Sequence, residues 1–188
     1  SKDKSKKIFS SSNKLKIINI GRFTDQKDQI TFLKSLNHLK NKINFEACII
    51  GKGILKTRLQ KYIIEKKLSR FVKIINFVEN PYPFIRQSDL FVLTSKYEGL
   101  PNVLLEALTL KKFVISSSCH TGPKEILLNG KGGLLFKVGD HIELANKIKY
   151  YFFNKKKCKK LLDESYKSLS RFDYKSNLLK YYKLIDSF

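Results

Sequence analysis

The sequence predicts an α/β protein built on a doubly wound, Rossmann-like parallel sheet of six strands with helices on both faces. Six short apolar runs alternate with longer segments of helical period, which is typical of a parallel sheet covered by helices. After residue 136 only helical segments follow. The chain has 188 residues and is 42% hydrophobic, enough to bury the core of one domain and to exclude disorder of the whole chain.

The strands and helices follow from these runs in order. Strands are predicted at 15–20, 45–50, 72–77, 90–94, 113–117 and 133–136, and closing helices near 140–153, 157–170 and 174–187. Between strands, Leu55, Leu59 and Ile63 mark one apolar helix face. With right-handed crossovers the expected strand order is 3-2-1-4-5-6, and ligands bind at the carboxyl ends of strands 1 and 4, where the order reverses.

The first fourteen residues are predicted to be a linker or tail, because charged residues and serine surround one apolar pair, Ile8 and Phe9. Folded structure is expected to begin near Leu15 and to continue through 15–188. The chain starts at Ser1 and contains no Met, so we expect it to be part of a longer protein.

The formal net charge of +22 makes an anionic partner the first class to consider. The simpler explanation of this charge is an AT-rich coding sequence, which gives a lysine-rich composition. Such a composition would place lysines on every solvated face. No apolar run is long enough to span a membrane and no signal-peptide pattern is present, which predicts a cytoplasmic protein. Three cysteines and three histidines show no metal-ligand or disulfide spacing, so neither a metal site nor a disulfide is expected.

Cationic side chains follow the first predicted strand. Gly21 permits a sharp turn, Arg22 can bind phosphate oxygens with two parallel hydrogen bonds, and Lys27 adds a second charge. In a chain this basic, an arginine and a lysine at that spacing also arise by chance. The second strand is followed by Gly51-Lys52-Gly53, which is neither a dinucleotide fingerprint nor a P-loop and is interpreted as a tight turn.

The loop after the fourth strand carries the most informative residues. Pro101 suits the first turn of a helix, so Glu98 precedes that helix and Glu106 lies inside it, with Asn102 at its start. Free N–H groups at a helix start favour a phosphate. Taken alone, both glutamates have ordinary explanations as a helix-start carboxylate and an exposed helix residue. The fifth loop holds His120, which is either a substrate contact or a surface histidine.

The segment Glu98-Gly-Leu-Pro-Asn-Val-Leu-Leu-Glu106, together with Gly21-Arg22-x-x-x-x-Lys27, resembles the donor-binding half of a GT-B glycosyltransferase of the retaining family 4. The resemblance runs from about Leu15 to Phe188. Asn80-Pro81-Tyr82-Pro83 and 122–127 are similar to members that add hexosamine-type sugars to polyprenyl-diphosphate-linked glycans of bacterial O-antigen, capsule or N-glycan type.

The resemblance implies a role for each matching residue. Arg22 and Lys27 would hold the diphosphate of the nucleotide sugar and act in catalysis with Glu98, which would face the donor sugar. Glu106 would accept hydrogen bonds from the ribose. The remaining donor-site residues implied are Gly21, Gly51, Phe77, Gly99, Leu100, Pro101 and Asn102. The implied donor is uridine-based, a UDP-hexose or UDP-N-acetylhexosamine, and no metal or other cofactor is expected.

The sequence departs from the family pattern at two places: Asn76 stands where a glycine is usual, and Cys119-His120 replaces small residues. The resemblance also implies that the final helix crosses back onto an N-terminal acceptor domain missing from this chain, with residues 1–14 as the linker. The acceptor would be a glycan or a polyprenyl-linked glycan, at the inner face of the cytoplasmic membrane. A basic nucleic-acid-binding domain, or a domain for anionic membrane surfaces with lysines 155–157, 159 and 160, is the alternative. No sequence-specific nucleic acid is expected as a partner, and the sequence does not indicate an oligomeric state.

Overall fold

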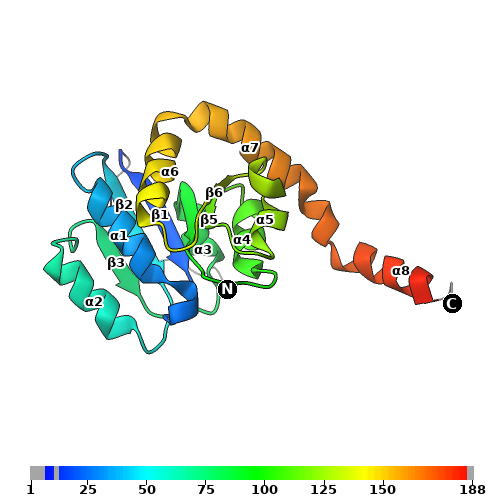
Figure 1. Ribbon diagram of the computed structural model, residues 1–188, viewed down its shortest axis with the longest axis horizontal. Coiled ribbons are helices and arrows are strands. Elements are labelled where there is room, and N and C mark those ends of the chain that lie inside the picture. The colour runs from blue at the N-terminus through cyan, green and yellow to red at the C-terminus, as the bar shows by residue number, and fades with distance from the viewer. Residues whose placement is uncertain (1–6, 11–12, 186–188) are drawn as a thin grey trace.

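The computed structural model describes residues 7–10 and 13–185 and has the predicted parallel sheet (Figure 1). The strand order is β3-β2-β1-β4-β5-β6, and every neighbouring pair is parallel, which confirms the doubly wound topology. The strands are β1 (Leu15–Ile20), β2 (Phe45–Ile50), β3 (Val72–Ile75), β4 (Leu90–Leu93), β5 (Phe113–Ser117) and β6 (Leu134–Phe136).

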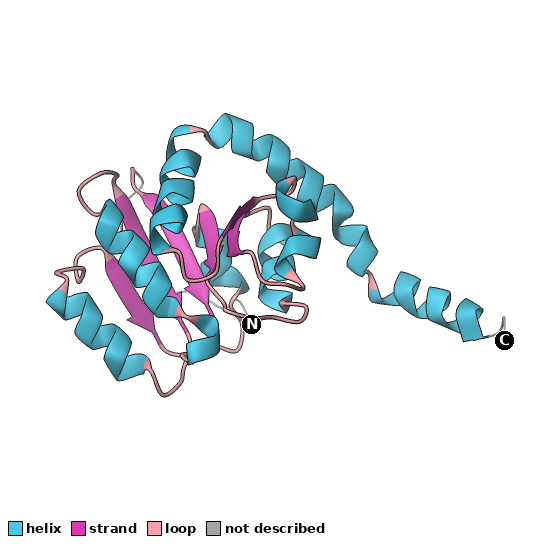
Figure 2. Ribbon diagram, viewed as in Figure 1, coloured by secondary structure: helices cyan, strands magenta, loops and turns pink. Residues whose placement is uncertain are grey.

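Helices connect the strands and continue beyond the last one (Figure 2). They are α1 (Gln29–Leu39), α2 (Lys56–Glu65), α3 (Tyr82–Gln87), α4 (Asn102–Thr109), α5 (Pro123–Ile126), α6 (His141–Phe153), α7 (Lys155–Lys167) and α8 (Tyr174–Ile185). Three short 3-10 turns, η1 (Asp25–Lys27), η2 (Leu128–Gly130) and η3 (Ser168–Phe172), join them.

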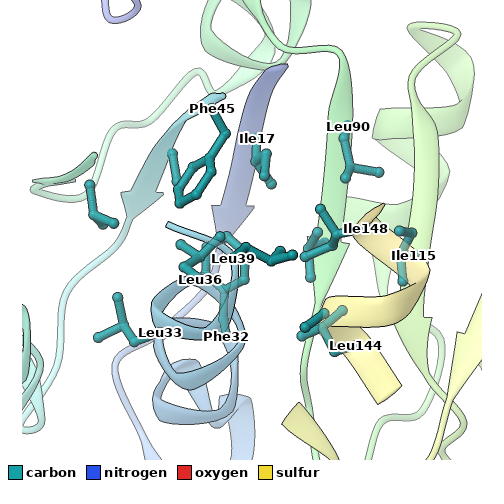
Figure 3. Close-up of a cluster of buried hydrophobic side chains, with 14 of the residues drawn as sticks. Ile17, Phe32, Leu33, Leu36, Leu39, Phe45, Leu90, Ile115, Leu144 and Ile148 are labelled. Atoms are coloured by element: carbon teal, nitrogen blue, oxygen red, sulfur yellow. The ribbon is translucent and has the colours of Figure 1, made fainter. Parts of the chain in front are cut away.

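The sheet separates two hydrophobic cores because successive side chains of a strand point to opposite faces. Ile17 belongs to the core under α1, α2 and α6, whereas its neighbour Ile18 belongs to the core under α3, α4 and α5. Figure 3 shows the first core, in which α1 contributes Phe32, Leu33, Leu36 and Leu39 and α6 contributes Leu144 and Ile148. Both faces are covered, as a parallel sheet requires.

Two predicted elements differ by two residues or more at a boundary, whereas β4 and β6 are each one residue shorter than predicted. β3 ends at Ile75, so Phe77 lies in the following loop. The helix predicted at 157–170 begins at Lys155 and ends at Lys167, where the 3-10 turn η3 takes over. There the Ser168 hydroxyl donates to the Ser165 carbonyl, and such local bonds of serine compete with a regular helix.

Regular secondary structure begins at Leu15, but residues 7–10, which were predicted to be linker, also pack against the domain. Ile8 and Phe9 are buried in the second core, and the backbone N–H of Ile8 donates to the Gln87 side chain. Ser10 donates twice to the carboxylate of Glu46, from its N–H and its hydroxyl. Burial raises the pKa of Glu46, but the bonds from Ser10 and the nearby Lys14 outweigh burial and lower it. The remaining residues of the predicted linker, 1–6, lie outside the described residues, as do 11 and 12.

The last helix, α8, extends away from the sheet (Figure 1). Its main contacts among the described elements are with η3. Several of its apolar side chains are exposed: Tyr174, Leu179, Tyr182 and Ile185. In the described part of the chain, none of the helices is both long enough and apolar enough to cross a bilayer. Cys48, Cys119 and Cys158 are buried free thiols.

Candidate functional site

A cleft of about 670 Å³ lies at the carboxyl ends of β1, β2 and β4, where the strand order reverses. Ligands of doubly wound sheets bind at this position. The structure brings ten of the eleven predicted donor-site residues to the cleft: Gly21, Arg22, Lys27, Gly51, Phe77, Glu98, Leu100, Pro101, Asn102 and Glu106. Gly99 is the exception, and its carbonyl oxygen instead lies against Gly122.

Glycine allows the loops behind β1 and β2 to approach closely. A Cβ atom on Gly51 would lie 2.0 Å from the carbonyl oxygen of Gly21. The two loops are joined by a hydrogen bond from the Gly21 N–H to the Ile50 carbonyl, 3.0 Å, and one from the Phe23 N–H to the Lys52 carbonyl, 2.8 Å. Gly51 is therefore required by the close contact of two backbones.

An ion pair between Lys27 and Glu98 joins the loops behind β1 and β4. The ammonium group of Lys27 lies 2.5 Å from Oε1 of Glu98, and the two side chains are only 16% and 7% exposed. The Ser95 hydroxyl donates to the same oxygen at 2.5 Å. The Thr94 hydroxyl donates to the Lys27 carbonyl, which fixes the backbone of η1 beside the strand end.

Arg22 and the start of α4 provide the other groups that attract anions. Arg22 is exposed, and its guanidinium has no acidic partner in the part of the chain that the structure describes. Buried Pro101 occupies the N-cap position of α4, and no side chain caps that helix. The Leu104 N–H donates to the Pro101 carbonyl, whereas the N–H groups of Asn102 and Val103 remain available to a ligand at the positive end of the helix dipole.

Glu106 lies one turn inside α4 and is half-buried, which raises the pKa of its carboxyl group. Besides the main cleft, Glu106 lines a second cavity of about 440 Å³ between α3 and α4, together with Tyr82, Arg86 and Leu105. Because Glu106 lines the cleft, its carboxylate can accept hydrogen bonds from a polar ligand bound there.

Sequence reasoning missed seven residues that line the cleft: Ile20, Ile50, Lys52, Val78, Glu79, Pro81 and Val103. Lys52 lies in the segment interpreted as a tight turn, and its ammonium group is 4.7 Å from the centroid of the Phe77 ring. Lys52 could have been found from its position shortly after β2, the strand that pairs with β1. His120 is exposed and does not line the cleft.

The loop after β5 supports the site from outside the cleft. Gly122 has φ +72°, and a Cβ atom there would lie 1.8 Å from the carbonyl oxygen of Gly99. The Thr121 hydroxyl donates to the Glu98 carbonyl at 2.6 Å. This loop therefore holds the backbone that carries Glu98, although its own residues do not line the cleft.

The residues that the structure describes include no group of three His, Cys, Asp or Glu side chains that could hold a metal ion. Two cations and an uncapped helix start suit a ligand with two adjacent negative charges, such as a diphosphate. Fold and site together define a doubly wound α/β domain with an anion-binding cleft at its switch point.

The chain belongs to the family described as "Glycosyl transferases group 1", whose model matches residues 1–168. An uncharacterized glycosyltransferase of Methanocaldococcus jannaschii is 37% identical over 139 residues, covering 73% of this chain and 32% of that protein. An N-acetyl-D-galactosaminyltransferase of Campylobacter jejuni, whose name gives an undecaprenol-diphosphate-linked glycan as acceptor, is 30% identical over 171 residues, covering 90% of this chain and 47% of the relative. The chain thus spans between a third and a half of the length of these two relatives.

Solved structures support the same fold. Anabaena HepE in complex with UDP superposes with a TM-score of 0.84 at 21% identity, over 94% of this chain and 50% of that chain. Staphylococcus aureus TarM, solved with UDP and glycan ligands, gives a TM-score of 0.82 at 22% identity, over 95% of this chain and 37% of its own. The predicted resemblance to one half of a GT-B glycosyltransferase is confirmed.

We expect Glu106→Gln to stabilise the fold above about pH 5 and to leave it unchanged near pH 3.5. At pH 3.5 the carboxyl is protonated in both the folded and the unfolded chain. As the pH rises past the ordinary glutamate pKa of 4.5, Glu106 loses its proton in the unfolded chain before it does so in the folded chain. The parent protein therefore loses folding stability, whereas the Glu106→Gln variant, which has no proton to lose, does not. Thermal unfolding should show a Tm gain of about 1 to 3 °C at pH 7. The exposed Glu125→Gln is the control, and an equal gain at both pH values would contradict the prediction.

Proposed function

We propose that this chain is the donor-binding domain of a retaining glycosyltransferase. It would bind a uridine nucleotide sugar, with hexose or N-acetylhexosamine, for transfer to a glycan or a polyprenyl-diphosphate-linked acceptor. The observation that carries the proposal is the convergence of Arg22, Lys27, the start of α4 and Glu106 on one cleft. In support, HepE was solved with UDP and with UDP-glucose, and the Campylobacter relative is named for transfer to an undecaprenol-linked glycan.

In this proposal, the cations act on the leaving group. Departure of a nucleoside diphosphate from the sugar builds negative charge on the phosphate oxygens. Arg22 and Lys27 line the same cleft as the start of α4, and donors held in place before the reaction stabilise such charge without a metal ion. Glu98 lines the same cleft and would face the sugar near the reacting carbon.

The nucleoside would lie between Glu106 and the loop after β3. Glu106 would accept hydrogen bonds from the ribose hydroxyls. Phe77 is 54% exposed and offers a ring face at the rim, with the ammonium group of Lys52 over the ring. The backbone of Leu100 and Pro101 would border the sugar and the phosphates.

Arg22→Ala should weaken UDP binding far more than uridine binding, because only UDP carries the diphosphate. Glu106→Ala should weaken binding of both ligands by roughly 1 to 3 kcal/mol, the cost of losing hydrogen bonds to a charged group. Calorimetric titration with uridine, UDP and a panel of other nucleotides and UDP-sugars measures both effects. Arg58→Ala and Glu125→Ala, which change charge away from the cleft, are the matched controls. Equal affinity of parent and Glu106→Ala for UDP would remove this carboxylate from the site.

We further propose that the acceptor is bound by a second domain, linked through the N-terminal segment and contacted by α8. The apolar side chains exposed on α8 support this, since Leu179 and Ile185 are 62% and 51% exposed. Positioning donor and acceptor in one closed site can lower the activation barrier by on the order of 7 to 11 kcal/mol. A donor-binding domain forms only one side of such a site and cannot provide this positioning alone.

Residues 1–188 should therefore bind donor but transfer sugar at the background rate. A longer protein with a second domain ahead of Ser1 should transfer sugar, and Glu98→Ala in that protein should lower kcat more than donor affinity. A radiolabelled UDP-sugar with a lipid-linked acceptor measures the rate. Fast transfer by residues 1–188 alone would show that no second domain is needed.

An anionic membrane surface, at the inner face of the cytoplasmic membrane, is the proposed partner of the basic start of α7. Five of the first six residues of α7 are lysines, with no acidic residue in the first turn and no capping side chain, at the end where the helix dipole disfavours cations. Phe153, next to it, is 64% exposed. The Tyr151 hydroxyl donates to the Asp89 carbonyl just before β4, so this corner lies at the amino ends of the strands, opposite the cleft.

Vesicles containing anionic lipid should bind the chain, and Lys156→Glu with Lys160→Glu should reduce binding by roughly tenfold or more, since each charge contributes about 1 kcal/mol near the surface. Lys34→Glu with Lys61→Glu, on α1 and α2, is the control of equal charge. Co-sedimentation at two salt concentrations measures binding, and UDP affinity should not change. Equal loss in the control pair, or base-specific binding of RNA that persists at physiological salt, would contradict the membrane proposal.

A further inference from the structure

The carboxylate of Glu98 is held on one side only. Its Oε1 atom receives both the ammonium group of Lys27 and the hydroxyl of Ser95. Its Oε2 atom has no hydrogen-bond partner within the residues that the structure describes. Because Glu98 lines the cleft, the fixed oxygen anchors the group and leaves the second oxygen for a ligand.

Ser95 is well placed to fix that geometry. It follows β4, is 0% exposed and does not line the cleft, so it cannot itself touch a ligand there. Its carbonyl oxygen accepts bonds from the Ser117 hydroxyl at 2.6 Å and the Cys119 thiol at 3.1 Å. The backbone of Ser95 is thereby tied to the end of β5, and its hydroxyl is left to bind Glu98.

A second hydroxyl holds the backbone of Glu98 itself. The Thr121 hydroxyl donates to the Glu98 carbonyl at 2.6 Å, and the backbone of Gly122 lies in close contact with the carbonyl of the neighbouring Gly99. Glu98 is therefore fixed at its carboxylate by Ser95 and Lys27 and at its main chain by Thr121. A glutamate without these bonds would sample several rotamers, and ordering it on binding would cost affinity.

We propose that Ser95 is a positioning residue that presents Glu98 to the sugar of the donor, with Thr121 as its main-chain counterpart. The proposal rests on the proposed function, because it assigns the sugar to Glu98. The proposal predicts different effects on two parts of the ligand. The support from Ser95 increases affinity for the sugar, whereas the nucleoside diphosphate is held by groups that Ser95 does not touch.

Ser95→Ala should reduce the affinity of residues 1–188 for UDP-glucose or UDP-N-acetylglucosamine roughly tenfold and leave the affinity for UDP within about twofold. Calorimetry with UDP and the two UDP-sugars measures both changes in affinity. Ser116→Ala is the matched control: Ser116 is equally buried on β5, and within the described residues its hydroxyl bonds to the Ser117 carbonyl and not to Glu98. The control should change neither affinity.

A double-mutant cycle separates positioning from packing. In the Glu98→Ala background, Ser95→Ala should cause no further loss of UDP-sugar affinity. Thr121→Val, at an exposed position, repeats the test if Ser95→Ala lowers the Tm. An unchanged UDP-sugar affinity in Ser95→Ala, an equal loss for UDP and UDP-sugar, or additive losses in the cycle would each overturn the role of Ser95. Failure of the parent to bind UDP or any UDP-sugar would instead overturn the proposed function, and with it this inference.

Discussion

The pairing of β1 with β4 is the constraint on which the site depends. Ile17 pairs with Leu90 and Ile18 with Phe91, so two strands far apart in the sequence run side by side and end at the same edge. Their following loops then meet, and Lys27 reaches Glu98 across 71 residues of sequence. The chain passes to opposite faces of the sheet on either side of this pair, which leaves space between α1 and α4 where a cleft can form.

The alternation of apolar runs with helical segments was sufficient to predict the strand order, because the central runs β1, β2, β4 and β5 are largely buried on both faces and crossovers between parallel strands are right-handed. The same rule predicted that the loops after β1 and β4, which carry Arg22 and Glu98, meet at the cleft, but not that the loops after β2 and β3 also line it. It could not predict which way a backbone turns inside a loop. Gly99 faces Gly122 because the Gly99 carbonyl lies directly against Gly122, and no periodic pattern records such a contact. The burial of Ile8 and Phe9 was missed because two apolar residues are too few to show a period.

The loops of the site are joined mainly through backbone groups. Glycine at 51 and 122 lets one main chain rest on the carbonyl of another, and hydroxyl groups of Thr94, Ser117 and Thr121 donate to carbonyls of neighbouring loops. Such contacts fix geometry without adding charge to the cleft. The charged groups therefore sit on a rigid frame, which is the arrangement that positioning of a ligand needs.

The Lys27–Glu98 pair has a consequence for which cellular anions compete for the cleft. The two side chains are mostly withdrawn from water, so the ammonium group already has its counter-ion and gains little from a single weak anion. Chloride, acetate or inorganic phosphate would have to displace a carboxylate that is tied to the protein at several points. A ligand that also binds Arg22 and the start of α4 does not depend only on displacing Glu98 from Lys27. A domain of net charge +22 can in this way keep Lys27 free of the abundant small anions that its charge attracts.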